Sequence, residues 1–449
     1  MGGDKGGEQS PPDGMTPPTT LARRLHIYGS CCLHSLCCSG IFHGWSGMKL
    51  IIEREGLFRH LCSPADGLMC EARSAKLVSI YSTAFGFSTA GYVVGAALMD
   101  VAGPRWTNVV SLSMSALALL VLSSNITSSS SWPPVSFGPL SIDWFSVAYS
   151  LLSLSGTMAQ TSSVHSSNVL PPIWRRLAVT SFSALFAIGS LVFVMMNIIS
   201  GSLGVPPSLL LRVWMCVEAL LAVNAAVVMP DRPCQALGAS KKERDEAEKK
   251  IPYRQLLGSH HFWFMAVFPA CGLTTCVFWL STYQDWLVEL GDLDRRLSTS
   301  SGLIIPAGPF LNPLFGLLLV RMGLKTGLVV LNCGIALLLL LSRTRSLALQ
   351  WVSVGVYAVC RPCVGSMTYA MVAALFGLPS FSRVFGTSSF IVGVVSSLVA
   401  PQLRHLAAAT SLPHVYGCLL FASLLLYIPL LLPLDGPRPS EPHEGKKER

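Results

Sequence analysis

The chain has 449 residues, of which 51% are hydrophobic and only 12% are charged, and its formal net charge is +9. Apolar runs long enough to cross a bilayer recur from one end to the other, which indicates a multi-pass integral membrane protein and excludes an ordinary soluble domain. The positive charge fits membrane topology, so we expect no nucleic-acid partner. We predict an all-α fold of about twelve transmembrane helices.

The N-terminal segment, residues 1–24, is polar and typical of a disordered cytosolic tail. The first predicted span runs from Leu25 to Met48 and is the least hydrophobic, because it contains histidines and paired cysteines. The cysteines around His34 leave a metal site open as one interpretation, but small residues packed in an apolar helix are the one we favour. We therefore expect no metal and no other cofactor.

The end of this span carries a recognisable motif, GIFHGWSGMKLIIEREGLFRHLC, from Gly40 to Cys62. It resembles solute carrier family forty-three, whose members read GxxFGW, then an EGYF-like run, then Cys. The residues that fall on this pattern are Phe42, Gly44, Trp45, Glu55, Gly56, Phe58 and Cys62. A second patch, Cys360 to Gly393, resembles the tenth and eleventh helices of that family. The resemblance implies sodium-independent transport of large neutral amino acids, with one branch that carries purine nucleobases.

Two cysteines of the predicted first outer loop, Cys62 and Cys70, are close enough in sequence to form a disulfide in an oxidising compartment. Cys62 also matches a family cysteine. We expect a disulfide here, whereas most other cysteines lie in spans and act as small apolar residues.

The segment from Ala96 to Arg105, AALMDVAGPR, is echoed by Gly316 to Lys325, GLLLVRMGLK. Both resemble the G-x-x-x-D-x-x-G-x-R pattern that joins the second and third helices in each half of major facilitator superfamily transporters. The residues that carry the pattern are Asp100, Gly103 and Arg105 in the first copy and Gly316, Gly323 and Lys325 in the second. The resemblance implies two six-helix halves and a gating latch in which charged groups join helix ends and release them. Val320 replaces the acid in the second copy, which predicts a weaker latch there.

The echo divides the chain into matching halves, residues 25–230 and 260–434, with a tail at 435–449. Between the halves lies a charged segment, residues 231–259, which includes KKERDEAEKK and is typical of a cytosolic linker. Lys and Arg collect mainly on the side of both termini, so we predict that both termini are cytosolic. A plasma-membrane location is favoured.

Arg361 is the candidate to bind a substrate carboxylate, because a guanidinium within an apolar helix is costly unless it faces a cavity or a partner. The alternative is an interhelical ion pair or a side chain that reaches the interface. Glu218, in the sixth predicted span, is an acid that could pair with Arg361 or relay protons. With so few buried carboxylates, uniport is favoured over proton coupling.

Aromatic residues on the first and seventh predicted helices are further candidates, since these helices are symmetry mates that meet at the central cleft. They could cover an apolar substrate side chain, although a Trp near a helix end is also typical of an interfacial anchor. The aromatic candidates are Phe42, Trp45, Trp279 and Tyr283, and their neighbours Gly44 and Gln284 complete the set.

These features predict an alternating-access carrier that is sodium-independent and facilitative, with large neutral amino acids as the favoured substrates. A purine nucleobase carrier and a non-transporting membrane sensor or scaffold are the alternatives. The scattered histidines form no convergent catalytic set, so we do not expect an enzyme. The expected partners are a small-molecule substrate and the lipid bilayer, and the expected state is a monomer.

Overall fold

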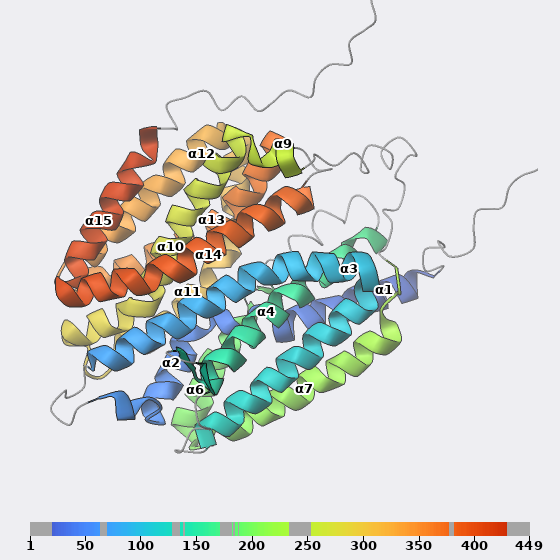
Figure 1. The fold of residues 1–449 in the computed structure, drawn as a ribbon, viewed down its shortest axis with the longest axis horizontal. Coiled ribbons are helices and arrows are strands. Elements are labelled where there is room, and N and C mark those ends of the chain that lie inside the picture. The colour runs from blue at the N-terminus through green and yellow to red at the C-terminus, as the bar shows by residue number, and fades with distance from the viewer. Residues whose placement is uncertain are drawn as a thin grey trace, which may run out of the picture.

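The structure, a computed structural model, describes residues 20–62, 70–127, 135–137, 140–170, 182, 185–186, 188–232, 253–376 and 381–428. It is a bundle of long helices in two groups, the first drawn blue to green and the second yellow to red (Figure 1). Within the described residues, eight helices are long and apolar enough to cross a membrane, and two shorter apolar helices accompany them. The predicted helical membrane class is confirmed.

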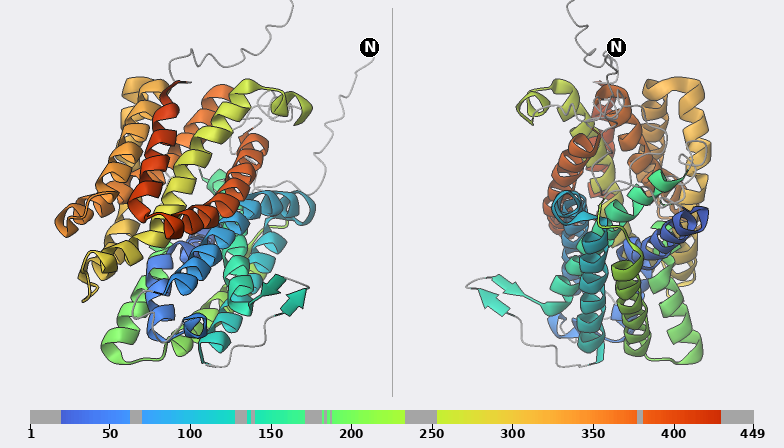
Figure 2. Two further views of the ribbon diagram at one scale, coloured as in Figure 1. Left: turned by 60° about the vertical axis from the view of Figure 1, so that its left-hand side comes forward. Right: turned by 90° about the vertical axis from the view of Figure 1, so that its right-hand side faces the viewer.

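The N-terminal group precedes the predicted linker. Its elements are α1 (Leu21–His34), η1 (Ser35–Ser39), η2 (Ile41–His43), α2 (Trp45–Arg54), η3 (Arg59–Leu61), α3 (Glu71–Thr127), α4 (Trp144–Val164), η4 (His165–Val169), α6 (Leu191–Leu203) and α7 (Pro207–Val228). A small antiparallel hairpin, β1 (Val135–Phe137) and β2 (Leu140–Ile142), precedes α4 and stands apart from the helices (Figure 2).

The C-terminal group contains the remaining elements. Its elements are α9 (Tyr253–Leu257), α10 (His260–Glu289), α11 (Arg296–Ala307), η5 (Gly308–Leu311), α12 (Asn312–Ser342), α13 (Leu347–Phe376), α14 (Phe381–Ala409) and α15 (Leu412–Leu425). The short helix α9 falls in the predicted linker, but residues 233–252 of that linker lie outside the described part of the chain. So do residues 1–19 of the predicted N-terminal tail and residues 429–449, which include the whole predicted C-terminal tail.

The repeated loop adopts the same backbone turn in both halves. Helices α3 and α12 each join two spans, and the bend falls at Gly103 (φ 76°, ψ 173°) and at Gly323 (φ 79°, ψ 166°). A positive φ of this size strains any residue with a Cβ atom, so glycine is required at both bends. The sequence echo thus marks two structurally equivalent turns.

The first span differs from the predicted helix Leu25 to Met48. It begins earlier, at Leu21, continues to Arg54, and is interrupted around Gly40 to Gly44. A Cβ atom on Gly40 would lie 1.6 Å from the carbonyl oxygen of Phe186, and one on Gly44 would lie 2.4 Å from that of Ser190. The interruption therefore allows the backbone of the fifth span to approach the first span closely.

A second interruption separates α11 from α12, where the 3₁₀ turn η5 follows a proline-containing segment. A Cβ atom on Gly308 would lie 1.6 Å from the carbonyl oxygen of Ala358 in α13. This close approach fixes the position of α13 at Ala358, one turn before Arg361.

The two groups of helices meet along α3 and α14, which run side by side in Figure 1. Small residues allow the contact: a Cβ atom on Gly393 would lie 1.5 Å from Thr89 Oγ1, and one on Gly86 would lie 2.9 Å from Ser397 Oγ. Tyr92 and Phe385 add an edge-to-face ring contact with centroids 5.6 Å apart. This contact extends over several turns of both helices.

Candidate functional site

Arg361 lies at the middle of α13 and reaches across to the N-terminal half. Its Nη2 atom hydrogen-bonds Nδ1 of His43, which belongs to the interrupted part of the first span. Tyr81 of α3 also lies within hydrogen-bonding reach of the guanidinium, and Tyr357 lies one turn earlier on α13. The interruption of the first span thus places the imidazole of His43 where the two halves meet.

The charge of Arg361 has no acidic partner in the described part of the chain, where every ion pair involves other residues. Glu218, the acid that could have paired with it, lies instead near Ser115 and Trp214 within the N-terminal half. A guanidinium in an apolar bundle is costly unless an anion approaches it. The guanidinium therefore carries a charge that no described acid pairs with.

Trp45 lies fully buried within the N-terminal half. It stacks on Tyr81, with ring centroids 5.3 Å apart, and meets Tyr149 edge-on at 5.2 Å. Phe42, just before it, accepts a hydrogen bond of 2.5 Å from the Tyr149 hydroxyl at its backbone carbonyl. These contacts hold Tyr81 in place beside Arg361.

Trp279 has the matching role in the C-terminal half. It stacks between Tyr283 and Tyr357, with centroid distances of 4.5 Å and 4.2 Å, and its indole nitrogen donates a 2.8 Å hydrogen bond to Ser342. Its faces are thus occupied by protein rings, and the candidate Trp279 supports the site through Tyr357. The Tyr283 hydroxyl bonds Ser301 at 2.6 Å.

Gln284 is a polar link between the halves. Its Nε2 atom donates to the carbonyl oxygen of Ser46 in α2 at 3.4 Å, while its Oε1 atom is buried and has no hydrogen-bond partner among the described residues. A buried amide oxygen without a partner is costly. In this arrangement the Gln284 oxygen therefore keeps an unmet acceptor position.

A set of charged residues, which we call the gate cluster, joins the halves at the end of the bundle that bears the predicted outer loops. Lys49 donates to Asp285 at 2.6 Å, and Ser74 also bonds Asp285. Two further ion pairs cross the interface. The gate cluster consists of Lys49, Glu53, Glu71, Arg73, Asp285, Arg295 and Arg404, with pairs between Glu53 and Arg295 and between Glu71 and Arg404.

The gate cluster was missed by sequence reasoning, because its cations were counted as ordinary charges of outer helix ends. The available signal was the position of Lys49, a charged residue within an otherwise apolar run. Lys49 is 1% exposed, which an outer-loop lysine would not be.

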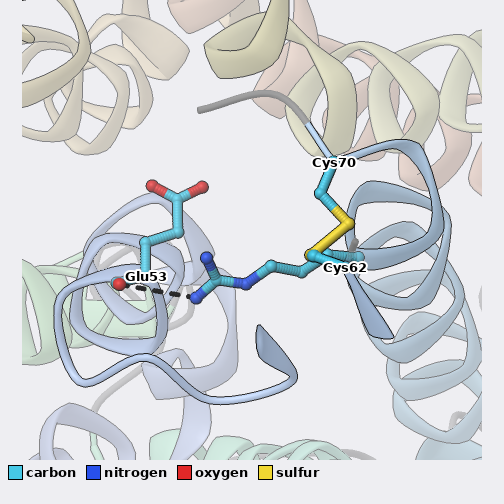
Figure 3. Close-up of a disulfide and its surroundings, with 4 residues drawn as sticks. Glu53, Cys62 and Cys70 are labelled. Carbon is cyan, nitrogen blue, oxygen red and sulfur yellow. Dashed lines mark hydrogen bonds between the residues drawn. A yellow bond between two sulfur atoms is a disulfide. The ribbon is translucent and has the colours of Figure 1, made fainter. Parts of the chain in front are cut away.

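The disulfide between Cys62 and Cys70, with Cα atoms 5.6 Å apart, lies beside the gate cluster (Figure 3). Close to this disulfide, Arg73 donates a hydrogen bond to the backbone oxygen of Glu53 at 3.4 Å. A pocket of about 70 Å³ among these residues has room for a few water molecules, since each occupies about 30 Å³. It is too small for an amino acid, so the gate cluster is closed.

The predicted latch has a partner at the opposite end of the bundle. Arg105 pairs with Asp231 at 2.8 Å and donates to the backbone oxygen of Met229 at 2.7 Å, which joins the repeated loop to the end of α7. In the second copy, Lys325 forms no ion pair with a described residue. The side chain of Asp100, and those of the helical segment that contains Gly316, lie outside the described part.

Comparison with solved structures identifies the architecture. A POT family transporter in complex with 5-aminolevulinic acid superposes with a TM-score of 0.65 over 91% of this chain and 95% of that one, at 12% identity. The fold is the major facilitator fold. A second POT family structure, in complex with a thioalcohol-conjugated peptide, gives a TM-score of 0.64 with the same coverage at 13% identity.

Sequence comparison adds less. No family model matches the chain. Protein FMP42 of Saccharomyces cerevisiae is 27% identical over 163 residues, which is 35% of this chain and 29% of that protein. The matched region thus spans less than a third of the curated relative. The resemblance to solute carrier family forty-three stays a prediction.

Proposed function

We propose that this protein is an alternating-access membrane transporter, a sodium-independent facilitative carrier of amino acids, with large neutral ones favoured. The observation that carries the proposal is Arg361, a cation without an acidic partner among the described residues, placed where the two halves of a major facilitator fold meet. A substrate carboxylate supplies the missing charge, because guanidinium and carboxylate form strong charge-assisted hydrogen bonds.

The substrate's ammonium group needs an acceptor or an aromatic face. The free oxygen of Gln284 supplies the first, and Tyr81 and Tyr357 beside Arg361 supply the second. The structural neighbour bound to 5-aminolevulinic acid, a molecule with a carboxylate and an amine, supports a zwitterionic substrate.

Alternating access requires the ends of the bundle to open in turn. With both termini cytosolic, the gate cluster closes the outer end, and its three ion pairs between the halves separate when that end opens. The pair between Arg105 and Asp231 lies at the inner end and joins the repeated loop to the start of the linker.

The proposal is tested by uptake into sealed liposomes that contain the purified protein. Labelled leucine, phenylalanine, 5-aminolevulinic acid and adenine are compared, with and without sodium and proton gradients. We expect uptake of leucine or phenylalanine without any gradient, and its loss in Arg361→Gln.

Arg343→Gln is the matched control, because Arg343 is an exposed arginine of the same half, at the end of α12. Its uptake should equal that of the wild type. Uptake of adenine alone, or normal leucine uptake by Arg361→Gln, would contradict the proposed substrate class and the role of Arg361.

A further inference from the structure

The gate cluster contains one more cation than acid, because Lys49 adds to the three arginines that line the pocket. The acids that line it are Glu53, Glu71 and Asp285, and each already has a cationic partner. Those partners are Arg295, Arg404 and Lys49 respectively. Arg73, the remaining cation of the pocket lining, forms no ion pair with a described residue.

The hydrogen bonds that Arg73 donates go to backbone oxygens and not to an acid among the described residues. Its Nη2 atom donates to two backbone oxygens, those of Ile52 at 3.1 Å and Glu53 at 3.4 Å. Carbonyl oxygens carry only partial negative charge. Its Nε atom is buried and has no hydrogen-bond partner among the described residues. A guanidinium in this state requires a further acceptor.

Arg404 faces the same pocket from the opposite half and is also incompletely satisfied. It is 5% exposed, yet its acid partner Glu71 has a side chain that is 56% exposed and meets it through one contact of 3.1 Å. The Nε atom of Arg404 is buried without a partner, like that of Arg73. Arg73 and Arg404, one from each half, therefore line one small pocket, and each has a guanidinium N–H without a partner among the described residues.

We propose that this pocket binds a small inorganic anion of the chloride class between Arg73 and Arg404. The volume of about 70 Å³ admits a monatomic anion and excludes the amino acid itself. Because Arg73 belongs to α3 and Arg404 to α14, the anion joins the two halves and stabilises the closed gate. This site is separate from the proposed substrate site at Arg361.

The test is thermal unfolding of the purified full chain in sodium chloride and in sodium gluconate at equal ionic strength. Chloride should raise the unfolding midpoint of the wild type by about 2 °C or more in a saturable way, since a ligand that binds only the folded state stabilises it. The increment should be lost in Arg73→Gln and in Arg404→Gln. Arg361→Gln should keep it.

A direct measurement accompanies unfolding, because either pocket variant could fold poorly. Equilibrium dialysis of radioactive chloride against the wild-type protein should show one saturable site from which bromide, but not gluconate, displaces the label. Arg73→Lys, which keeps the charge but removes the Nε donor, should bind chloride at least about tenfold more weakly.

Three results would overturn the site: no chloride-specific shift and no bound label in the wild type, an unchanged increment in both pocket variants, or loss of the increment only in Arg361→Gln. The last result would place the anion at the substrate site. Leucine added in gluconate tests the proposed function separately, because its effect on the midpoint should depend on Arg361 and not on Arg73.

Discussion

Buried cations of this chain fall into two kinds that differ only in their partners. Lys49 is 1% exposed and is held by Asp285, whereas Arg361 meets a histidine and a tyrosine. A paired buried cation joins two elements, and we propose that the unpaired one receives a ligand. Each kind makes its own prediction.

Removing Lys49 should open the gate cluster. In Lys49→Met the carboxylate of Asp285 stays buried without its cation, and breaking a buried pair in this way typically costs about 3–5 kcal/mol. We expect a clear fall in the thermal midpoint. Lys76→Met is the control, because the pair of Lys76 with Asp143 is more exposed and such pairs contribute about 0–1 kcal/mol. Equal losses in the two variants would contradict the role assigned to Lys49.

Asp143, just before α4, predicts a pH dependence. Burial opposes its ionisation, but hydrogen bonds from Lys76 and Ser146 outweigh burial and hold its pKa below the usual range. A lowered folded-state pKa stabilises the protein above the unfolded value of about 3.9, and this stability is lost as pH falls through the folded pKa. Acid unfolding monitored by circular dichroism should be less steep in Asp143→Asn below about pH 4. Superimposable acid transitions would exclude this contribution.

At the scale of elements, the repeated turn offers an internal comparison. Gly103→Ala and Gly323→Ala both place a Cβ atom at positive φ, which costs about 1–2 kcal/mol. Only the first variant also meets a neighbour, since a Cβ atom on Gly103 would lie 1.8 Å from the backbone oxygen of Asp231. A Cβ atom on Gly323 would have no atom of another described element within 4 Å. The thermal midpoint should therefore fall further for Gly103→Ala. The reverse order would show that the contact with Asp231 does not constrain the turn.

Sequence patterns were informative for elements and not for the contacts between them. The echo of Ala96 to Arg105 in Gly316 to Lys325 located both bends, because a turn at positive φ depends on glycine itself. The interruption of the first span was not predicted, since it depends on the backbone of Phe186, far along the chain. The partners of Lys49 and Arg404 also lie in the opposite half, where no local spacing relates them.

The same distinction applies to the candidate site. Arg361 stood out as a charge in an apolar helix, but its approach to His43 depends on how the two halves dock. Trp45 and Trp279 were chosen as aromatic residues near a cleft. Their side chains instead stack within their own halves, because rings of that size are stabilised most when fully buried.

At the scale of the whole molecule, the gate cluster predicts a coupled opening. Leu77 lines its pocket and is 2% exposed, so Leu77→Cys should react slowly with a membrane-impermeant thiol reagent. Adding Lys49→Met should increase the labelling rate, because the halves separate more often at that end. The wild-type chain, treated in parallel, gives the background from its own cysteines. An unchanged rate in the double variant would show that the pair does not hold the end closed.

The long contact between α3 and α14 determines how such an opening takes place. Glycine and small hydroxyl side chains let the two backbones approach without interdigitated large side chains. This contact, which we call the seam, therefore resists separation of the two helices but does little to block rotation of one helix against the other. A small rotation of one half about this seam would move the atoms of α3 and α14 little. Helices farther from the seam would move more, in proportion to their distance from it. The seam would thus act as an axle that ends at the gate cluster, where Glu71 of α3 and Arg404 of α14 form an ion pair and stay close while helices farther away separate.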